Sequence, residues 1–176
     1  MLIDTASDTV WVLNPDGLHT NLFMWRHPAL DGAALPEAEA LSFAVPQEIR
    51  LGETIEVLAP EIEAACAFTR TFDDEPGLPT GNTTQTQIDC FGYEIAGFDR
   101  KIEFVFADGQ LALAWILTGV GDEARLRQLL TGQYGEPAAA IPPGLEFFPG
   151  ERIALRTDKP EILIASDAVV SAFLGR

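Results

Sequence analysis

The stretch Arg100–Gly119, RKIEFVFADGQLALAWILTG, decides the fold. Two apolar runs flank the dipeptide Asp108-Gly109, and Asp-Gly accepts positive φ at the centre of a two-residue turn. The stretch therefore predicts a β-hairpin with arms at 101–107 and 111–118. Because a two-residue turn connects antiparallel neighbours, we expect an antiparallel sheet around it.

Alternation along the two arms predicts which side chains share a face. The side chains expected on the core face are Ile102, Phe104, Phe106, Leu111, Leu113, Trp115 and Leu117. Among these we expect Trp115 to be a large core residue. The opposite face is only partly polar, so a second layer of structure can cover it as well.

Further elements surround this hairpin. Alternating or apolar runs predict strands at 85–91, 152–157 and 161–166. Apolar residues at spacings of three and four predict helices at 54–69 and 122–134. We therefore expect an α+β fold, with an antiparallel sheet built from hairpins and helices packed on one face.

The ends of the helices carry their own signals. Thr54 is a suitable N-cap for the first helix, and Pro60 is expected to break or kink it because proline cannot donate to the i−4 carbonyl. Gly135 and Pro137 end the second helix. A short last helix is expected to begin at Ser166 or Asp167.

The order of elements suggests a single domain over 1–176 with internal repetition. An N-terminal hairpin is expected at 9–25, followed by an irregular segment at 26–51. A first helix-sheet unit would occupy 52–119 and a second, shorter unit 120–176. One interpretation is that these are two degenerate helix-plus-hairpin units.

Charge excludes several classes of partner. The chain has 11 basic and 27 acidic residues, a net charge of −16 and a pI near 4.2. Such a chain would repel a nucleic-acid backbone and an anionic membrane surface, whereas a basic protein partner is compatible with it. No apolar run approaches the ~20 residues of a membrane span, so we expect no membrane insertion.

The N-terminal residues contain no basic region followed by an apolar run, so no signal peptide is predicted. This favours a cytoplasmic location, or a periplasmic one if a leader has been removed. Only two of the 11 basic residues are lysines, and with abundant alanine this composition is typical of a GC-rich bacterial genome.

The two cysteines are predicted to be neighbours in the core. Cys66 lies in phase with the apolar stripe of the first helix, and Cys90 shares the inward face of the 85–91 strand with Ile88. A helix packed on the sheet brings such positions close together. Either a disulfide or two buried thiols satisfies the pattern, and a disulfide would favour an envelope location.

Motifs for catalysis and for cofactors are weak. His19 and His27 are the only histidines, and neither forms a zinc-type pair, so we predict no metal, no cofactor and no catalytic residues. A cluster of these histidines with Asp16 and Asp31 can be drawn near the first hairpin, although exposed polar residues explain it more simply.

The best candidates for recognising an anionic small ligand are Trp25, Arg26, His27 and Arg100. They combine an aromatic ring with groups that carry or acquire positive charge. Ordinary surface or ion-pair roles are the alternative.

Two short sequence tokens are similar to a known group of proteins. The second helix ends in Tyr134-Gly135-Glu136-Pro137, and the first opens with Gly52-Glu-Thr-Ile. With the helix-then-hairpin order over roughly 50–166, this pattern resembles the small bacterial envelope domains of the β-lactamase-inhibitor-protein and SmpA/OmlA type. The resemblance implies α+β domains with helices on one face of an antiparallel sheet, and a binding or scaffolding role rather than catalysis.

These observations favour a non-enzymatic binding or inhibitor-like module. It would act through a sheet face or through the loops at 26–46 and 73–84. One alternative is a carrier that holds an apolar ligand between sheet and helices. Another is a small enzyme with a His/Asp site near the first hairpin.

Overall fold

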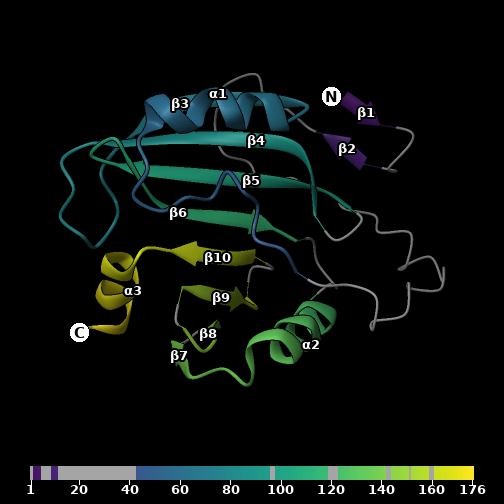
Figure 1. Ribbon diagram of the computed structural model, residues 1–176, viewed down its shortest axis with the longest axis vertical. Coiled ribbons are helices and arrows are strands. Elements are labelled where there is room, and N and C mark those ends of the chain that lie inside the picture. The colour runs from purple at the N-terminus through teal and green to yellow at the C-terminus, as the bar shows by residue number, and fades with distance from the viewer. Residues whose placement is uncertain are drawn as a thin grey trace.

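The structure is a computed structural model that describes residues 2–4, 9–11, 43–95, 98–118, 123–141, 144–150, 152–158 and 161–176 (Figure 1). Within these ranges the chain forms an eight-stranded sheet with strand order β3-β4-β5-β6-β10-β9-β8-β7. Its strands are β3 (Phe68–Asp74), β4 (Gln85–Ile95), β5 (Phe98–Ala107), β6 (Gln110–Leu117), β7 (Ala139–Ile141), β8 (Leu145–Phe147), β9 (Ile153–Arg156) and β10 (Glu161–Ala165). The helices are α1 (Ile55–Ala65), α2 (Glu123–Tyr134) and α3 (Asp167–Leu174).

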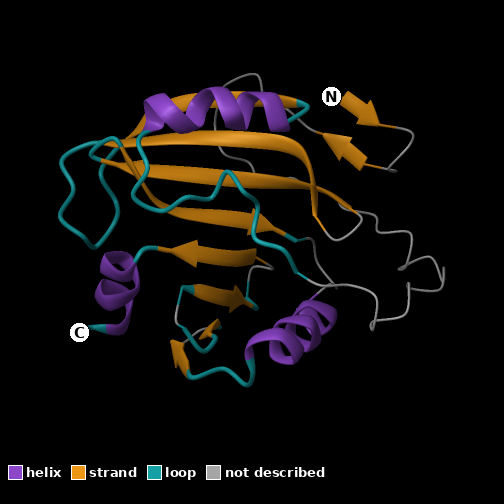
Figure 2. Cartoon of the chain, viewed as in Figure 1, coloured by secondary structure: helices purple, strands orange, loops and turns teal. Residues whose placement is uncertain are grey.

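Every neighbouring pair of strands in this sheet is antiparallel, which confirms the predicted α+β class (Figure 2). The chain order is a helix followed by four antiparallel strands, twice over. The first half is α1 with β3 to β6, and the second is α2 with β7 to β10. The last strands of the two halves, β6 and β10, pair with each other at the centre of the sheet.

A β-bulge in the central hairpin corrects the predicted division of side chains between the two faces. The turn is as expected, with φ of 48° at Asp108 and 79° at Gly109. Beyond it, Phe106 pairs with Leu111 but Val105 pairs with Leu113, so one extra residue stands on β6. That shift places Ile116, not Trp115, opposite Ile102. Leu113 and Trp115 therefore point away from the face that was predicted to hold them.

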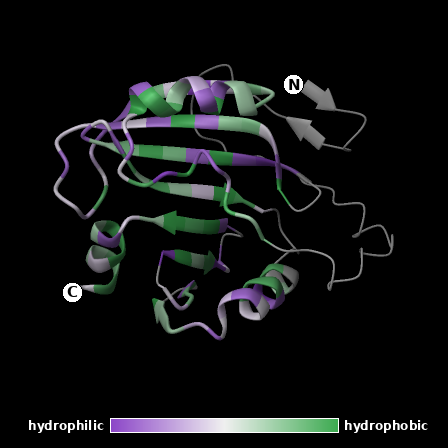
Figure 3. Ribbon diagram, viewed as in Figure 1, coloured by the Kyte–Doolittle hydropathy of each residue, from purple (hydrophilic) through white to green (hydrophobic). Residues whose placement is uncertain are grey.

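Both faces of the sheet are covered, but by different helices. On one side, here called face A, Leu58 and Ile62 of α1 and Leu126 and Leu130 of α2 pack on the sheet. On the other side, face B, Val169 and Val170 of α3 pack around Leu113. Figure 3 shows the alternation behind this division as bands of hydrophilic and hydrophobic residues along β4 and β5. The prediction of helices on one face holds for α1 and α2 and is wrong for α3, because the sheet is apolar on both sides at its centre.

Helix α1 differs from the predicted helix in two ways. It continues through Pro60 without a break, and Pro60 is exposed. It ends at Ala65 rather than Thr69, because Phe68 already begins β3. Thr54 occupies the N-cap position as predicted, but its side chain makes no capping hydrogen bond.

Three strands lie where no strand was predicted. β3 occupies residues assigned to the end of a helix and the start of a loop, and β7 and β8 lie in the segment 138–144 and just after it, which reads as a proline-rich connector. At the N-terminus, β2 (Thr9–Trp11) is a strand as predicted, and it pairs with β1 (Leu2–Asp4). The rest of the hairpin expected at 9–25, from residue 12 onward, lies outside the described residues.

Gly92 produces a second bulge, in β4. The register with β5 shifts between Phe91 and Tyr93, and Gly92 has φ of 77°. A Cβ at this position would lie 2.7 Å from the Cβ of Ala67. Glycine is therefore required both by the backbone conformation and by the close approach of the chain that leads into β3.

Candidate functional site

Of the residues predicted to bind a small anionic ligand, the structure describes only Arg100. Trp25, Arg26 and His27 lie outside the described residues, as does the cluster drawn around His19. Arg100 is described, and only 1% of it is exposed. Because so little of its side chain is exposed, Arg100 lies inside the fold, where it stands opposite Tyr93 of the neighbouring strand.

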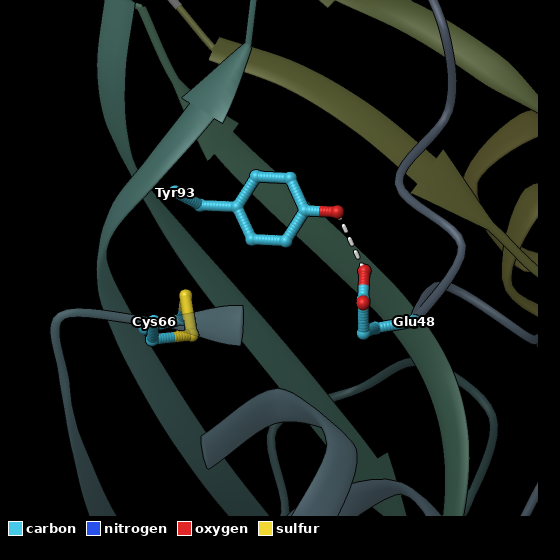
Figure 4. Close-up of a disulfide and its surroundings, with 4 residues drawn as sticks. Glu48, Cys66 and Tyr93 are labelled. Carbon is cyan, nitrogen blue, oxygen red and sulfur yellow. Dashed lines mark hydrogen bonds between the residues drawn. A yellow bond between two sulfur atoms is a disulfide. The ribbon is translucent and has the colours of Figure 1, made fainter. Parts of the chain in front are cut away.

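Cys66 and Cys90 are joined by a disulfide (Figure 4). Their Cα atoms are 5.5 Å apart, and 24 positions separate them in sequence. Cys66 is the C-cap of α1 and Cys90 is fully buried in β4. Of the two alternatives that the sequence left open, the structure has the disulfide, which ties the end of α1 to the sheet.

A partly buried hydrogen bond lies beside this disulfide. The Tyr93 hydroxyl points at Glu48 and donates to its Oε2 at 2.6 Å (Figure 4). Glu48 is 3% exposed, and Gln47 Nε2 donates to its other carboxylate oxygen at 3.2 Å. Burial, and then the bond to Glu48, raise the pKa of Tyr93 well above its ordinary value. The contact fastens the segment before α1 to β4.

Face B carries aromatic and charged residues in two rows that cross the strands. Strand register places the first row in the order Phe68, Phe91, Lys101, Leu117, Glu161 and Arg156. It places the second in the order Arg70, Asp89, Glu103, Trp115 and Leu163. The aromatic and charged members form what we call the face-B strip: Phe68, Arg70, Asp89, Phe91, Lys101, Glu103, Trp115, Arg156 and Glu161.

A buried ionic cluster forms the centre of the face-B strip. Lys101 Nζ lies 2.9 Å from Asp89 Oδ2 and 2.6 Å from Glu103 Oε1. Gln87 Nε2 donates to the other Asp89 oxygen at 2.8 Å. Lys101 and Asp89 are 4% and 2% exposed, so each is held in place by its partners, and removal of one would leave a buried charge uncompensated.

Aromatic contacts lie on either side of that cluster. The rings of Phe68 and Phe91 stack with centroids 4.3 Å apart, and Lys101 Nζ lies 5.3 Å from the Phe91 centroid. On the far side, the Arg156 guanidinium lies 5.6 Å from the Trp115 ring centroid. Contacts of this kind between cations and aromatic rings fix the orientation of both groups.

Two carboxylates hold Arg156 in that position. Its Nε donates to Asp158 Oδ1 at 3.1 Å, and its Nη1 donates to Glu161 Oε2 at 3.3 Å. These two hydrogen bonds thus fix the orientation of the guanidinium. Preorganised arginine and tryptophan side chains are favourable components of a binding surface because little conformational entropy remains to be lost.

The face-B strip is balanced in charge. Its cations are Arg70, Lys101 and Arg156, and its anions are Asp89, Glu103 and Glu161. The chain as a whole has a net charge of −16. The strip is therefore neutral overall on a strongly acidic protein. Asp89, Phe91 and Lys101 are buried in it, whereas Phe68, Arg70, Trp115 and Arg156 are partly exposed.

The described residues offer little else that resembles a reactive site. They contain no group of three or more histidine, cysteine, aspartate or glutamate side chains placed to hold a metal ion. In the same part of the chain, no helix has the length and apolar character needed to cross a bilayer.

Comparison of the chain with protein-family models, with curated proteins and with solved structures finds no match. The sequence prediction did not include the face-B strip. One local signal for it was available: Phe68 to Phe72 reads Phe-Thr-Arg-Thr-Phe, which is the alternation of a strand with Phe and Arg on one face.

Proposed function

We propose that this protein is a non-enzymatic binding module that takes a protein partner on the face-B strip. The observation that carries the proposal is the position of Phe68, Trp115 and the arginines on one sheet face. Phe68 and Trp115 are half-buried, and Phe68 belongs to neither core cluster. Tryptophan and arginine are the residue types most enriched at the energetic centres of protein interfaces.

The pattern of charge supports a protein partner. The acidic body of the molecule attracts a basic protein over a distance, whereas Lys101 and Arg156 of the strip are already paired with carboxylates of the strip itself. The repeated order of one helix and four antiparallel strands also fits the proposed resemblance to the β-lactamase-inhibitor-protein and SmpA/OmlA type, for which binding or scaffolding is implied.

The test compares three baits in a quantitative pull-down. They are the unaltered protein, the double variant Trp115→Ala/Arg156→Ala, and the control Val57→Ala. Val57 is a 45% exposed apolar residue of α1, on the opposite side of the sheet. Circular dichroism first establishes that all three baits are folded at the temperature of the experiment.

A partner retained by the unaltered protein and by the Val57→Ala control, and lost by the double variant, supports the proposal. Titration of that purified partner should then show binding at least tenfold weaker for the double variant, as expected when central aromatic and arginine contacts are removed. A partner that binds all three baits equally would place the binding surface elsewhere on the molecule.

A further inference from the structure

The two edges of the sheet are unequal. β7, at one edge, has three residues, with Pro137 before it and Pro142 directly after it in the sequence. β3, at the other edge, has seven residues and contains neither proline nor lysine. Short strands, proline and charged side chains, lysine above all, are the usual means by which proteins prevent other chains from pairing with a sheet edge. β7 has two of these protections, whereas β3 has only its charged side chains, Arg70, Asp73 and Asp74.

The hydrogen-bonding direction of each β3 residue follows from the register. The Asp108 amide donates to the Thr84 carbonyl at 3.1 Å, so these two residues, which stand just before β4 and just after β5, form a hydrogen-bonded pair next to the pair Gln85 and Ala107. Because hydrogen bonds alternate along antiparallel strands, Gln85, Gln87, Asp89 and Phe91 direct their backbone groups toward β3 instead. The Ser166 amide also donates to the Ala112 carbonyl, next to the pair Ala165 and Leu113. When the alternation of hydrogen bonds is followed from this bond across β6 and then β5, it gives the same assignment for β4.

The β3 residues that receive those bonds are Phe68, Arg70, Phe72 and Asp74. The residues between them, Thr69, Thr71 and Asp73, therefore direct their backbone amides and carbonyls outward. Within the described ranges β3 is paired with β4 alone. Its seven pairs run without a register shift, and the Cys66–Cys90 disulfide fastens the chain two residues before the strand begins. The edge is consequently held in the extended form that another strand requires.

The charge around this edge indicates what would pair with it. Asp73 and Asp74 end β3 and Glu75 follows, so three acidic residues stand in a row. A second copy of this chain would bring the same acidic row and a further net charge of −16. A basic segment would instead be attracted to this end of the strand. Side chains on alternate positions of such a segment would adjoin Phe72 on face B and Asp73 on face A.

We propose that β3 accepts an extended segment of a partner protein, with alternating basic and apolar residues, as a ninth strand of the sheet. Strand addition supplies affinity through backbone hydrogen bonds. The side chains at alternate positions of the added strand, basic on one face and apolar on the other, supply specificity. This proposal goes beyond the face-B strip, because it uses outward backbone groups at the edge rather than side chains on the face. It can succeed or fail independently of the first proposal.

The test uses a defined probe, the acetylated and amidated peptide Lys-Val-Lys-Val-Lys-Val-Lys. Amide hydrogen exchange is followed by NMR at Thr69, Thr71 and Asp73, with Arg70 and Phe72 as internal references. In the free protein the first three amides should exchange fast and the two references slowly. Slow exchange at Thr69, Thr71 and Asp73 without peptide would overturn the proposal, because the edge would already be covered.

With the peptide in saturating amount, exchange at Thr69, Thr71 and Asp73 should slow at least tenfold. Two control peptides separate strand addition from charge attraction: one with N-methyl groups at alternate residues, and one with glutamate in place of lysine. Neither should slow exchange. Equal protection by the N-methylated peptide, or no protection by the basic one, contradicts strand addition.

The acidic end of β3 is tested with Asp73→Asn/Asp74→Asn, for which peptide binding should weaken about tenfold. The matched control Glu56→Gln/Glu63→Gln removes two exposed charges from α1 and should bind as the unaltered protein does. Equal weakening in both variants would show that net charge alone attracts the peptide. Sedimentation showing a dimer in which the same three amides are protected would make a second copy the occupant and overturn the proposal.

Discussion

Reduction of the Cys66–Cys90 disulfide should lower the free energy of unfolding by about 3.5 kcal/mol. The two residues are 24 positions apart, and the chain-entropy model assigns roughly this value to a closed loop of about 25 residues. The loop contains the whole of β3 and the connection that leads to β4. The reduced protein would retain Leu58 and Ile62 as the fully buried contacts of α1.

The measurement is urea unfolding followed by circular dichroism, on the same protein with and without a phosphine reductant. If the m-value is about 2.5 kcal/mol/M, the expected loss corresponds to a fall of about 1.4 M in the midpoint. The double variant Cys66→Ala/Cys90→Ala gives a second value that does not depend on the reductant. Thiol titration of the denatured, unreduced protein should find no free thiol at these two positions.

Two results would refute this reasoning. A difference below about 1 kcal/mol between oxidised and reduced protein would show that the unfolded chain is not restrained by the bond, or that α1 and β3 are held by other contacts. Two titratable thiols in the unreduced sample would show that the bond is not formed at all.

Three further predictions concern single side chains. Gly92→Ala should cost about 2 kcal/mol more than Gly52→Ala in urea unfolding, because both have positive φ but only at Gly92 would a Cβ lie 2.7 Å from another. Hydroxyl and amide hydrogen bonds from the preceding loop hold the pKa of Asp108 below its ordinary value. The stability that the ionised carboxylate contributes is therefore complete above the pKa of Asp108 in the unfolded chain, and it is lost as the pH falls through the pKa in the folded protein. Asp108→Asn should flatten the acid limb of a stability–pH profile, and an unchanged limb would contradict this. Trp115→Ala should lower the free energy of unfolding in urea by about 2 kcal/mol, against ~3–5 kcal/mol for Phe104→Ala, because Trp115 is half-buried and Phe104 is fully buried. Equal losses in the two variants would show that Trp115 is a core residue after all.

The predicted hairpin was correct because its signal is local. An Asp-Gly turn and two alternating arms lie within 20 residues, and the backbone conformation at Asp108 and Gly109 is a property of those two residues. The bulge at Ala112 has no comparable signal. It depends on how β6 meets β5 and β10 together, and it moved Trp115 from the predicted core face to face B.

The strand β3 was missed because its first residues also fit a helix. Thr69 continues the spacing of Ile62 and Cys66, and this reading hid the strand alternation from Phe68 to Phe72. Pairing with β4 over seven residues decides in favour of the strand. β7 and β8 have three residues each, too few to show any periodicity.

The face-B strip as a whole depends on register, so local patterns could predict only parts of it. Lys101 and Glu103 are two positions apart on one strand, and their shared face follows from the sequence alone. That Asp89 stands beside them, or Arg156 beside Trp115, follows from the pairing of β4 with β5 and from the order β6-β10-β9. The predicted ligand residues were chosen by residue type, and three of the four lie outside the described residues, so that prediction stays a prediction.

The junction between β6 and β10 connects the stability of the fold to the proposed binding surface. Trp115 belongs to the first half of the chain and Arg156 to the second, and their contact crosses this junction. The fully buried pair Ile116 and Ile162 lies across the same two strands on face A, beneath the helices. A substitution that weakens the packing of Ile116 against Ile162 would separate the two parts of the face-B strip, although neither residue belongs to the strip. Binding should therefore respond to changes at the junction as well as to changes on face B, because the strip exists only while the two halves share one sheet.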